Sequence, residues 1–293
     1  MAASGLHISI SAEKLFSIGD LAITNSMFTS MIVSTILITF AFVVNKQLTQ
    51  TNNPKGLQNF AEMIIETLHK LVNGITGDLK KTRLFLPIIS TFFLWILLNN
   101  WLGLVPGVGT ISIVESAEPK QYIETQETQE HSFFVQSAHA ANTPELLAAA
   151  NSGEGEHATT KLVPVLRPGT ADLNTTLALG IISVLATQIF GMTYLQLGYF
   201  KKFINFSSPI MFFVGILELI SEFAKIISFA FRLFGNIFAG EVLLVVMAFL
   251  LPIIVPMPFY GLELFVGFIQ ALVFSLLSLV FFNMATISHD EEH

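Results

Sequence analysis

The stretch Phe231-Arg232-Leu233-Phe234-Gly235-Asn236 places an arginine inside one of the longest apolar runs of the chain. No other arginine occurs between Pro168 and the C-terminus. A charged side chain at the centre of a bilayer costs roughly 2.5–3.5 kcal/mol on insertion scales, and such residues are rare and usually functional. We therefore interpret Arg232 as a fixed positive charge in a low-dielectric region, which points to ion movement across a membrane.

The composition indicates a polytopic membrane protein. Of the 293 residues, 53% are hydrophobic and only 12% are charged, whereas about 25% of the residues of a soluble domain are charged. The chain has no cysteine, which excludes disulfide and thiolate chemistry. No basic stripe interleaved with aromatic residues occurs, so we expect no nucleic-acid partner.

Five apolar stretches are long enough, or nearly so, to cross a bilayer as helices, which takes about 20 residues. They are residues 28–44, 84–105, 173–199, 208–251 and 259–287. In the fourth stretch Ser208 fits the helix N-cap and Pro209 the first helical position. This helix would be about 65 Å long and the fifth about 43 Å, against a hydrocarbon core of about 30 Å. We therefore expect two long, steeply tilted helices, connected as a hairpin by the proline-rich link that begins at Pro252.

The remaining segments suggest a topology. Residues 56–71 carry apolar side chains at three- and four-residue spacing. We favour an amphipathic helix in the membrane interface, with an ordinary surface helix as the alternative. Basic residues gather in segment 45–83 and again after the third span, which places both segments in the cytoplasm. The glutamate-rich loop 106–171 and residues 1–27 would then lie outside, and the tail 288–293 inside.

The expected fold is therefore an all-α polytopic membrane protein with about five membrane-embedded helices and one amphipathic interfacial helix. Pro87 is expected in the first turn of the second span. The low-complexity loop contains His131, His139 and His157, which could be metal ligands. Their spacings fit no compact metal-binding motif, so we expect a solvated loop, no metal site and no cofactor.

One face of the fourth helix carries a polar stripe from the cytoplasmic end to mid-membrane. At 100° per residue, positions 218, 222, 225, 229, 232 and 236 share this face, which includes Asn236. We interpret the cytoplasmic part as one half of an ion path, formed by Glu218, Ser221, Glu222 and Ser228. The alternative is that Glu222 and Lys225 pair near the interface, with the lysine snorkelling to water.

A second polar group lies nearer the outside. Glu241 is about 180° from Arg232 on the same helix. Glu263 lies near the outer end of the fifth helix, and Gln270 shares its face at greater depth. Carboxylates suit a proton path because they take up and release protons. We expect two laterally separated half-pathways with Arg232 between them. The structural alternatives are a proton shared by Glu241 and Glu263, an interhelical hydrogen bond from Gln270, and an ion pair of Arg232 with a glutamate.

The run from Phe231 to Glu241, FRLFGNIFAGE, closely resembles the signature of subunit a of F-type ATP synthases. Further similar stretches are Leu98–Pro106, Pro168–Thr176 (which includes Asp172), Leu217–Ser221 with Lys225, and Gln270-Ala271. The resemblance implies a membrane stator with two proton half-channels beside a rotating ring. Arg232 would face the ring carboxylate and prevent leakage between the half-channels. In the outer half-channel this chain has two carboxylates, where many members of the family pair one carboxylate with a histidine.

The resemblance also implies partners and location. The partners would be the ring of c subunits, the peripheral-stalk b subunits and the remainder of the ATP synthase. The subunit would be non-catalytic and would couple proton flow to ring rotation in a bacterial inner membrane, with a mitochondrial inner membrane as the alternative. A secondary transporter would require repeats and broken helices that are not visible. An intramembrane hydrolase lacks its motifs in the spans, and a structural scaffold would leave Arg232 unexplained.

Overall fold

The computed structural model describes residues 12–18, 21–48, 56–105, 108, 112–116, 160–196, 198–199, 203, 208–250 and 256–287. The chain divides into two compact units, residues 112–163 and the remainder. In the smaller unit, strand β3 (Ser112–Ser116) pairs with strand β4 (Thr160–Pro164). These strands lie in the segment for which the sequence predicts only a loop.

The larger unit is helical. Its described residues form α1 (Asn25–Gln47), α2 (Leu57–Thr76), α3 (Leu79–Gly103), α4 (Leu173–Leu195), α5 (Pro209–Leu250) and α6 (Pro256–Ala285). All of these except α2 are long and apolar enough to cross a membrane, so the predicted all-α polytopic class is confirmed. Two short elements were not predicted: an antiparallel hairpin of β1 (Lys14–Ile18) and β2 (Leu21–Thr24), and the 3-10 turn η1 (Gly169–Ala171).

The start of α3 differs from the prediction. The Asp78 carboxylate accepts a hydrogen bond from the backbone N–H of Lys80 at 2.8 Å, which caps the helix at Leu79. Because the first turn of α3 is basic, the apolar stretch that begins at Leu84 does not show where the helix starts. Pro87 consequently lies inside the helix and not in its first turn, where we had placed it. There it removes one backbone donor from the helical ladder.

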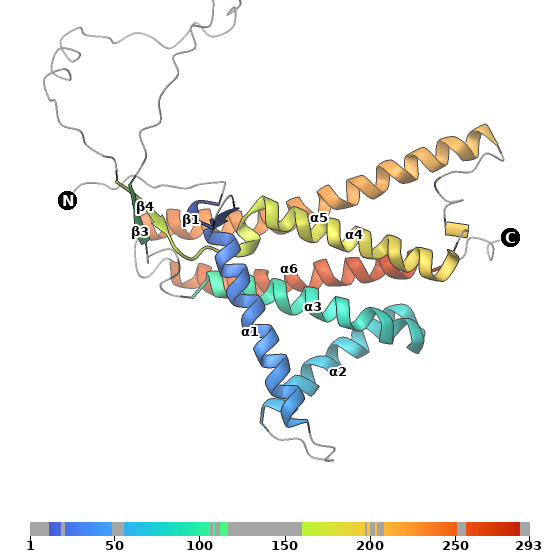
Figure 1. The fold of residues 1–293 in the computed structure, drawn as a ribbon, viewed down its shortest axis with the longest axis horizontal. Coiled ribbons are helices and arrows are strands. Elements are labelled where there is room, and N and C mark those ends of the chain that lie inside the picture. Colours follow the sequence, from blue (N-terminus) through green and yellow to red (C-terminus); the bar gives the residue numbers. More distant parts are fainter. Residues whose placement is uncertain are drawn as a thin grey trace, which may run out of the picture. The chain divides into compact units, whose positions relative to one another are not determined.

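The helices α3, α4, α5 and α6 run alongside one another, whereas α1 departs from them at an angle (Figure 1). The closest neighbours are α3 with α6 and α4 with α5. Aromatic rings fill the space between them. Phe85 contacts both Phe190 and Phe282, with ring centroids 4.9 and 5.7 Å apart. These three buried rings from α3, α4 and α6 fix the spacing of the bundle.

Two contacts define the register of the antiparallel pair α5 and α6. The rings of Phe229 and Phe274 lie 4.8 Å apart, centroid to centroid. Three turns along α5, a Cβ atom on Gly240 would overlap the carboxyl group of Glu263. Both contacts fit one antiparallel register, which places Gln270 at the level of Leu233. The link 251–255 lies outside the described residues.

Asn100, only 3% exposed, ties three parts of the bundle together. Its Nδ2 donates to the Gly267 carbonyl of α6 at 3.0 Å, and its Oδ1 accepts from Thr170 Oγ1 at 2.7 Å. The neighbouring Trp101 Nε1 donates to the Leu264 carbonyl at 3.1 Å. The end of α3 therefore holds both α6 and the segment that leads into α4.

We expect Asn100→Leu to destabilise the protein by about 1–3 kcal/mol, because it leaves the buried Thr170 hydroxyl without its acceptor. Chemical unfolding of the purified protein in detergent, followed by circular dichroism, measures the change. Trp101→Phe is the matched control, since it also removes a donor to α6 but from a more exposed side chain. Equal losses in the two variants would contradict the role given to Asn100.

Candidate functional site

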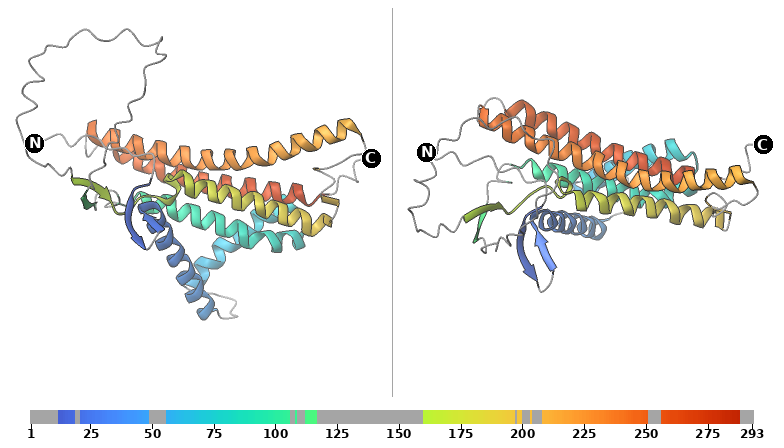
Figure 2. Two further views of the ribbon diagram at one scale, coloured as in Figure 1. Left: turned by 45° about the horizontal axis from the view of Figure 1, so that its top comes forward. Right: turned by 90° about the horizontal axis from the view of Figure 1, so that it is seen from above.

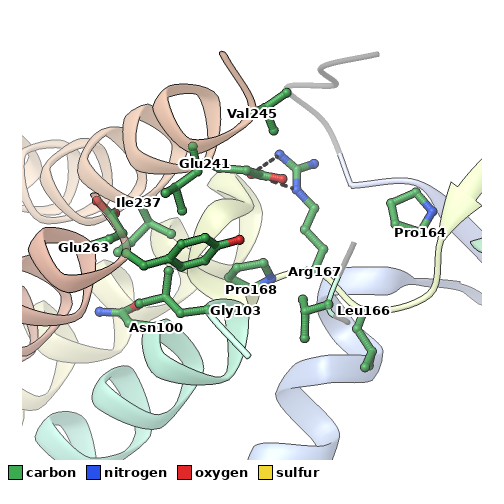
Figure 3. A pocket seen from close by; sticks show the side chains of 14 residues that line it. Asn100, Gly103, Pro164, Leu166, Arg167, Pro168, Ile237, Glu241, Val245 and Glu263 are labelled. Atoms are coloured by element: carbon green, nitrogen blue, oxygen red, sulfur yellow. Dashed lines mark hydrogen bonds and ion pairs between the residues drawn. The ribbon is translucent and has the colours of Figure 1, made fainter. Parts of the chain in front are cut away.

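A cavity of about 150 Å³ opens at the end of the bundle where α3, α5, α6 and the segment before α4 meet (Figure 3). Its polar lining comes from Asn100, Arg167, Glu241, Tyr260 and Glu263. One water needs about 10–15 Å³ of such space, so several waters fit. A polar cavity of this size can hold a short hydrogen-bonded water chain.

Arg167 and Glu241 form an ion pair across this cavity. Arg167 Nη2 lies 3.1 Å and Nε 3.4 Å from Oε2 of Glu241. Arg167 is 5% exposed, and its backbone N–H donates to Thr29 Oγ1 of α1 at 3.2 Å. Figure 3 shows the guanidinium reaching from the segment before α4 to the carboxylate on α5. A buried charge is tolerated when it is paired in this way.

Glu263 lies in a different environment. It is 8% exposed, and its Oε1 atom has no hydrogen-bond partner among the described residues. Its carboxyl group packs against the backbone of α5 at Gly240, where a side chain would overlap it. The absence of a Cβ at Gly240 therefore lets α6 bring this carboxylic group to the wall of the cavity.

Two further buried polar atoms continue inward from Glu263. Gln270 Nε2 and Asn236 Nδ2 are both buried and have no hydrogen-bond partner within the described part of the chain. Gln270 lies about 10 Å along α6 from Glu263, and Asn236 lies one turn from Gly240 on α5. Buried polar atoms are nearly always hydrogen-bonded, to protein or to water. A row of such atoms next to a polar cavity offers hydrogen-bonding sites to water.

Arg232 lies at the inner end of this row. Its side chain is exposed on a surface of α5 that no described element covers. Its Nη2 donates to Ser228 Oγ at 3.4 Å. Across the described ranges no carboxylate lies within ion-pair distance of it, so the structural alternative of an internal ion pair for Arg232 is not observed. The guanidinium is available to a group outside this chain.

Towards the start of α5 a second cluster of charges is found. Lys225 Nζ lies 2.8 Å from Glu222 Oε1 and 4.7 Å from the centroid of the Phe281 ring. Tyr199, in the segment after α4, donates to Gln188 Oε1 at 2.6 Å. Burial, reinforced by the negative charges of Glu222 and Glu218, raises the pKa of Tyr199 to about 12. Tyr199 is therefore a neutral hydrogen-bond donor at ordinary pH.

Two comparisons with known proteins agree with this arrangement. A sequence profile described as ATP synthase A chain matches residues 27–283. ATP synthase subunit a of Gloeobacter violaceus is 31% identical over 287 residues, which cover 98% of this chain and 94% of the relative. The chain belongs to the ATP synthase A chain family.

Family membership makes this chain a multi-pass membrane subunit of the proton-translocating sector of ATP synthase. The resemblance drawn from the FRLFGNIFAGE run is thereby confirmed.

The predicted site residues fall into three groups in the structure. Glu241 and Glu263 line the cavity, and Asn236 and Gln270 follow it inward. Arg232 is joined to Ser228 on the exposed surface of α5, where Ser221 is exposed as well. Glu218 is half-buried near Glu222. Glu222 and Lys225 form an ion pair, which is the structural alternative that the sequence analysis left open for these two residues.

Asp172 occupies a capping position. Its carboxylate accepts from the backbone N–H of Asn174 at 3.4 Å and from Thr175 Oγ1 at 3.3 Å, which caps α4. It is not part of the cavity lining. His131, His139 and His157 lie outside the described residues. Among the residues that are described, no three His, Asp or Glu side chains are grouped to hold a metal ion.

Sequence reasoning missed Arg167, Asn100 and Tyr199. Arg167 is the only basic residue between Lys161 and Lys201, and it directly precedes the Pro168-Gly169 turn into the third span. This isolation next to a span was a usable signal. Asn100 carries no such signal, because its partners Thr170 and Gly267 lie far away in the sequence. Tyr199 carries none, because its burial follows only from the fold.

Gly240→Ala should impair passive proton conduction through the membrane sector, because the new methyl group overlaps the Glu263 carboxyl. Conduction is measured as decay of an imposed pH gradient in vesicles stripped of the soluble ATPase. Gly261→Ala on α6 is the matched control, since a Cβ there meets no described atom. Both changes gain similar helix propensity, up to about 1 kcal/mol. Equal conduction in the two variants would show that the close approach is unimportant.

The phenol of Tyr199 should ionise near pH 12, about two pH units above an ordinary tyrosine, because burial and nearby carboxylates disfavour the phenolate. Spectrophotometric titration of the tyrosinate band in detergent, compared with Tyr199→Phe, isolates this group. Glu222→Gln removes one negative charge and should lower its pKa. A titration in which Tyr199→Phe removes only a component near pH 10 would refute the assignment.

Proposed function

We propose that this chain is the non-catalytic stator of the proton path, with two offset half-channels that meet a rotating ring of c subunits at Arg232. The observation that carries the proposal is the exposed, internally unpaired Arg232 guanidinium on the free surface of α5. A charge in hydrocarbon without a partner is strongly unfavourable. A ring carboxylate passing this surface supplies the missing negative charge.

The outer half-channel is formed by the cavity and the row that leads inward from it. Water enters beside Glu241 and Glu263, and the unsatisfied atoms of Gln270 and Asn236 provide hydrogen-bonding sites along the way. The register of α5 and α6 brings Gln270 level with Leu233, which is adjacent to Arg232. Protons therefore reach the ring surface close to the arginine, on the side of the cavity.

The inner half-channel follows the surface of α5 on the other side of Arg232. Glu218, Ser221 and Ser228 lie along it at intervals of three and seven residues, and the serines are exposed. The hydrogen bond to Ser228 draws the guanidinium towards this side. The positive charge favours the ionised form of a ring carboxylate beside it, so a proton leaves before the carboxylate passes. The same charge blocks direct proton flow between the half-channels.

The topology assigned to the segments completes the proposal. The cavity faces the outside, whereas α2 and the Lys-rich start of α3 face the cytoplasm, as the distribution of Lys and Arg indicates. Asp172 contributes to the outer half-channel indirectly: it caps the start of α4, next to the segment that carries Arg167 into the cavity. The membrane is a bacterial inner membrane, and the peripheral-stalk b subunits hold the chain against rotation.

Arg232→Ala should abolish ATP-driven proton pumping in membrane vesicles and raise the passive proton leak by at least an order of magnitude once the soluble ATPase is removed. The reason is that neither the ionised ring carboxylate nor the barrier between half-channels is then stabilised. Pumping is followed by quenching of a pH-sensitive dye, and assembly by recovery of the other subunits. Arg83→Ala, which removes an exposed arginine from α3, is the matched control.

Normal coupled pumping by assembled Arg232→Ala would overturn the proposal, because it would show that the charge serves only the structure. Arg232→Lys sharpens the test. A lysine keeps the charge but not the fork of donors that holds Ser228 and a carboxylate at once. We expect that variant to block the leak better than Arg232→Ala while pumping poorly.

A further inference from the structure

We propose that Arg167 is a positioning residue that holds Glu241 as a fixed counter-ion, so that Glu263 alone carries protons through the cavity. This inference rests on the proposed function and divides the labour between the two carboxylic groups of its outer half-channel. Glu241 would serve the path through its charge, and Glu263 through the exchange of a proton.

The contacts of Glu241 support the first half of the inference. Two nitrogens of Arg167 converge on one oxygen, Oε2, at 3.1 and 3.4 Å. The Arg167 side chain is 6% exposed and that of Glu241 33% exposed, so the pair is only partly screened by solvent. Charge-assisted hydrogen bonds from an enclosed guanidinium are roughly twice as strong as neutral ones and hold the carboxylate in a fixed geometry. Glu241 is therefore fixed in place as the counter-ion of Arg167.

The anchoring of Arg167 makes this contact rigid. The backbone N–H of Arg167 donates to Thr29, and the nearby Pro164 carbonyl accepts from Asn25 Nδ2 at 3.2 Å. The ring of the adjacent Pro168 packs so closely on Gly103 of α3 that no Cβ fits there. The backbone that carries Arg167 is therefore anchored to α1 and α3, whereas its partner Glu241 belongs to α5.

Glu263 has the opposite set of contacts. Within the described part of the chain its buried Oε1 accepts no hydrogen bond, and its carboxyl group lies between the cavity and the inward row of Gln270 and Asn236. In one cycle, a hydronium in the cavity gives its proton to a Glu263 oxygen and becomes water. The O–H bond then breaks as the proton passes inward along water, and the carboxylate is restored.

The cavity also shows why the pairing matters. Among the described residues, the ionisable groups that line it are Arg167, Glu241, Tyr260 and Glu263. Without Arg167, two carboxylic groups would share one small cavity with no cation among its described lining residues. Proton exchange would be divided between two coupled groups, and the inward transfer from Glu263 would slow.

The test measures passive proton conduction in vesicles stripped of the soluble ATPase, with assembly checked by subunit recovery. Arg167→Gln and Glu241→Gln should each lower conduction several-fold, since each leaves one member of the pair unmatched. Arg167→Lys should restore part of it. The decisive variant is the charge swap Arg167→Glu with Glu241→Arg, which keeps the ion pair but removes the carboxylate from position 241. We expect the swap to conduct better than either single Gln variant.

A swap that assembles but conducts no better than Glu241→Gln would overturn the inference, because the carboxylate at position 241 would then be required as a proton carrier. Normal conduction in Arg167→Gln or in Glu241→Gln would also overturn it, because the pair would have no role in positioning. If a single variant fails to assemble, Arg167→Lys and the swap still decide the question.

Glu263→Gln separates this inference from the proposed function. Blocked conduction in Glu263→Gln together with a conducting swap supports both. If conduction is blocked both in Glu263→Gln and in an assembled swap, the proposed outer half-channel still stands. Only the division of labour between Glu241 and Glu263 is then refuted. Unchanged conduction in Glu263→Gln refutes the outer half-channel itself, and with it the role given to Arg167.

Discussion

A charged side chain inside a membrane protein needs an opposite charge or a bound water as its partner. In α5 and α6 some of the charged side chains have an ion-pair partner and others do not. Glu222 is paired with Lys225 and Glu241 with Arg167. Neither Arg232 nor Glu263 has an ion-pair partner in the described ranges. Arg232 lies between these two pairs along α5, and Glu263 on α6 lies level with Gly240, next to the second pair. The groups left without an ion-pair partner, Arg232 and Glu263, are therefore the ones that the proposed function assigns to the ring carboxylate and to the mobile proton.

The packing of α5 against α6 decides where the unmatched groups lie. Gly240 lets the two helices approach closely at Glu263, and the Phe229–Phe274 contact fixes the same register three turns away. Figure 2 shows α5 curving along its length. One side of α5 packs on α4 and α6, whereas the other side is exposed. The polar stripe read from the helical wheel straddles the boundary of these two sides: Glu222 is buried against the bundle and Arg232 is exposed.

Much of this was accessible from sequence, for a physical reason. Arg232, Glu241 and Glu263 stand out because a charge in an apolar run is costly wherever the run folds, and the length of α5 follows from an uninterrupted pattern between Pro209 and Pro252. Arg167 was not recognised because it lies in a loop: its isolation next to a span was visible in the sequence, but its burial follows only from the fold. The start of α3 was missed because its cap at Asp78 precedes a basic turn that an apolar window excludes.

The Arg167–Glu241 pair is difficult to explain by stability alone. The cost of removing two charges from water commonly equals or exceeds their attraction, and well-packed apolar residues at such positions are often as stable or more so. What an apolar pair cannot provide is a charged, polar part of the cavity wall that hydrogen-bonds to water. Water in a cavity needs polar partners on the wall, and Arg167 and Glu241 are two of the five side chains that form the polar lining here. The ion pair is therefore better understood as a condition for a hydrated entrance, with Glu263 placed just behind it to receive the proton.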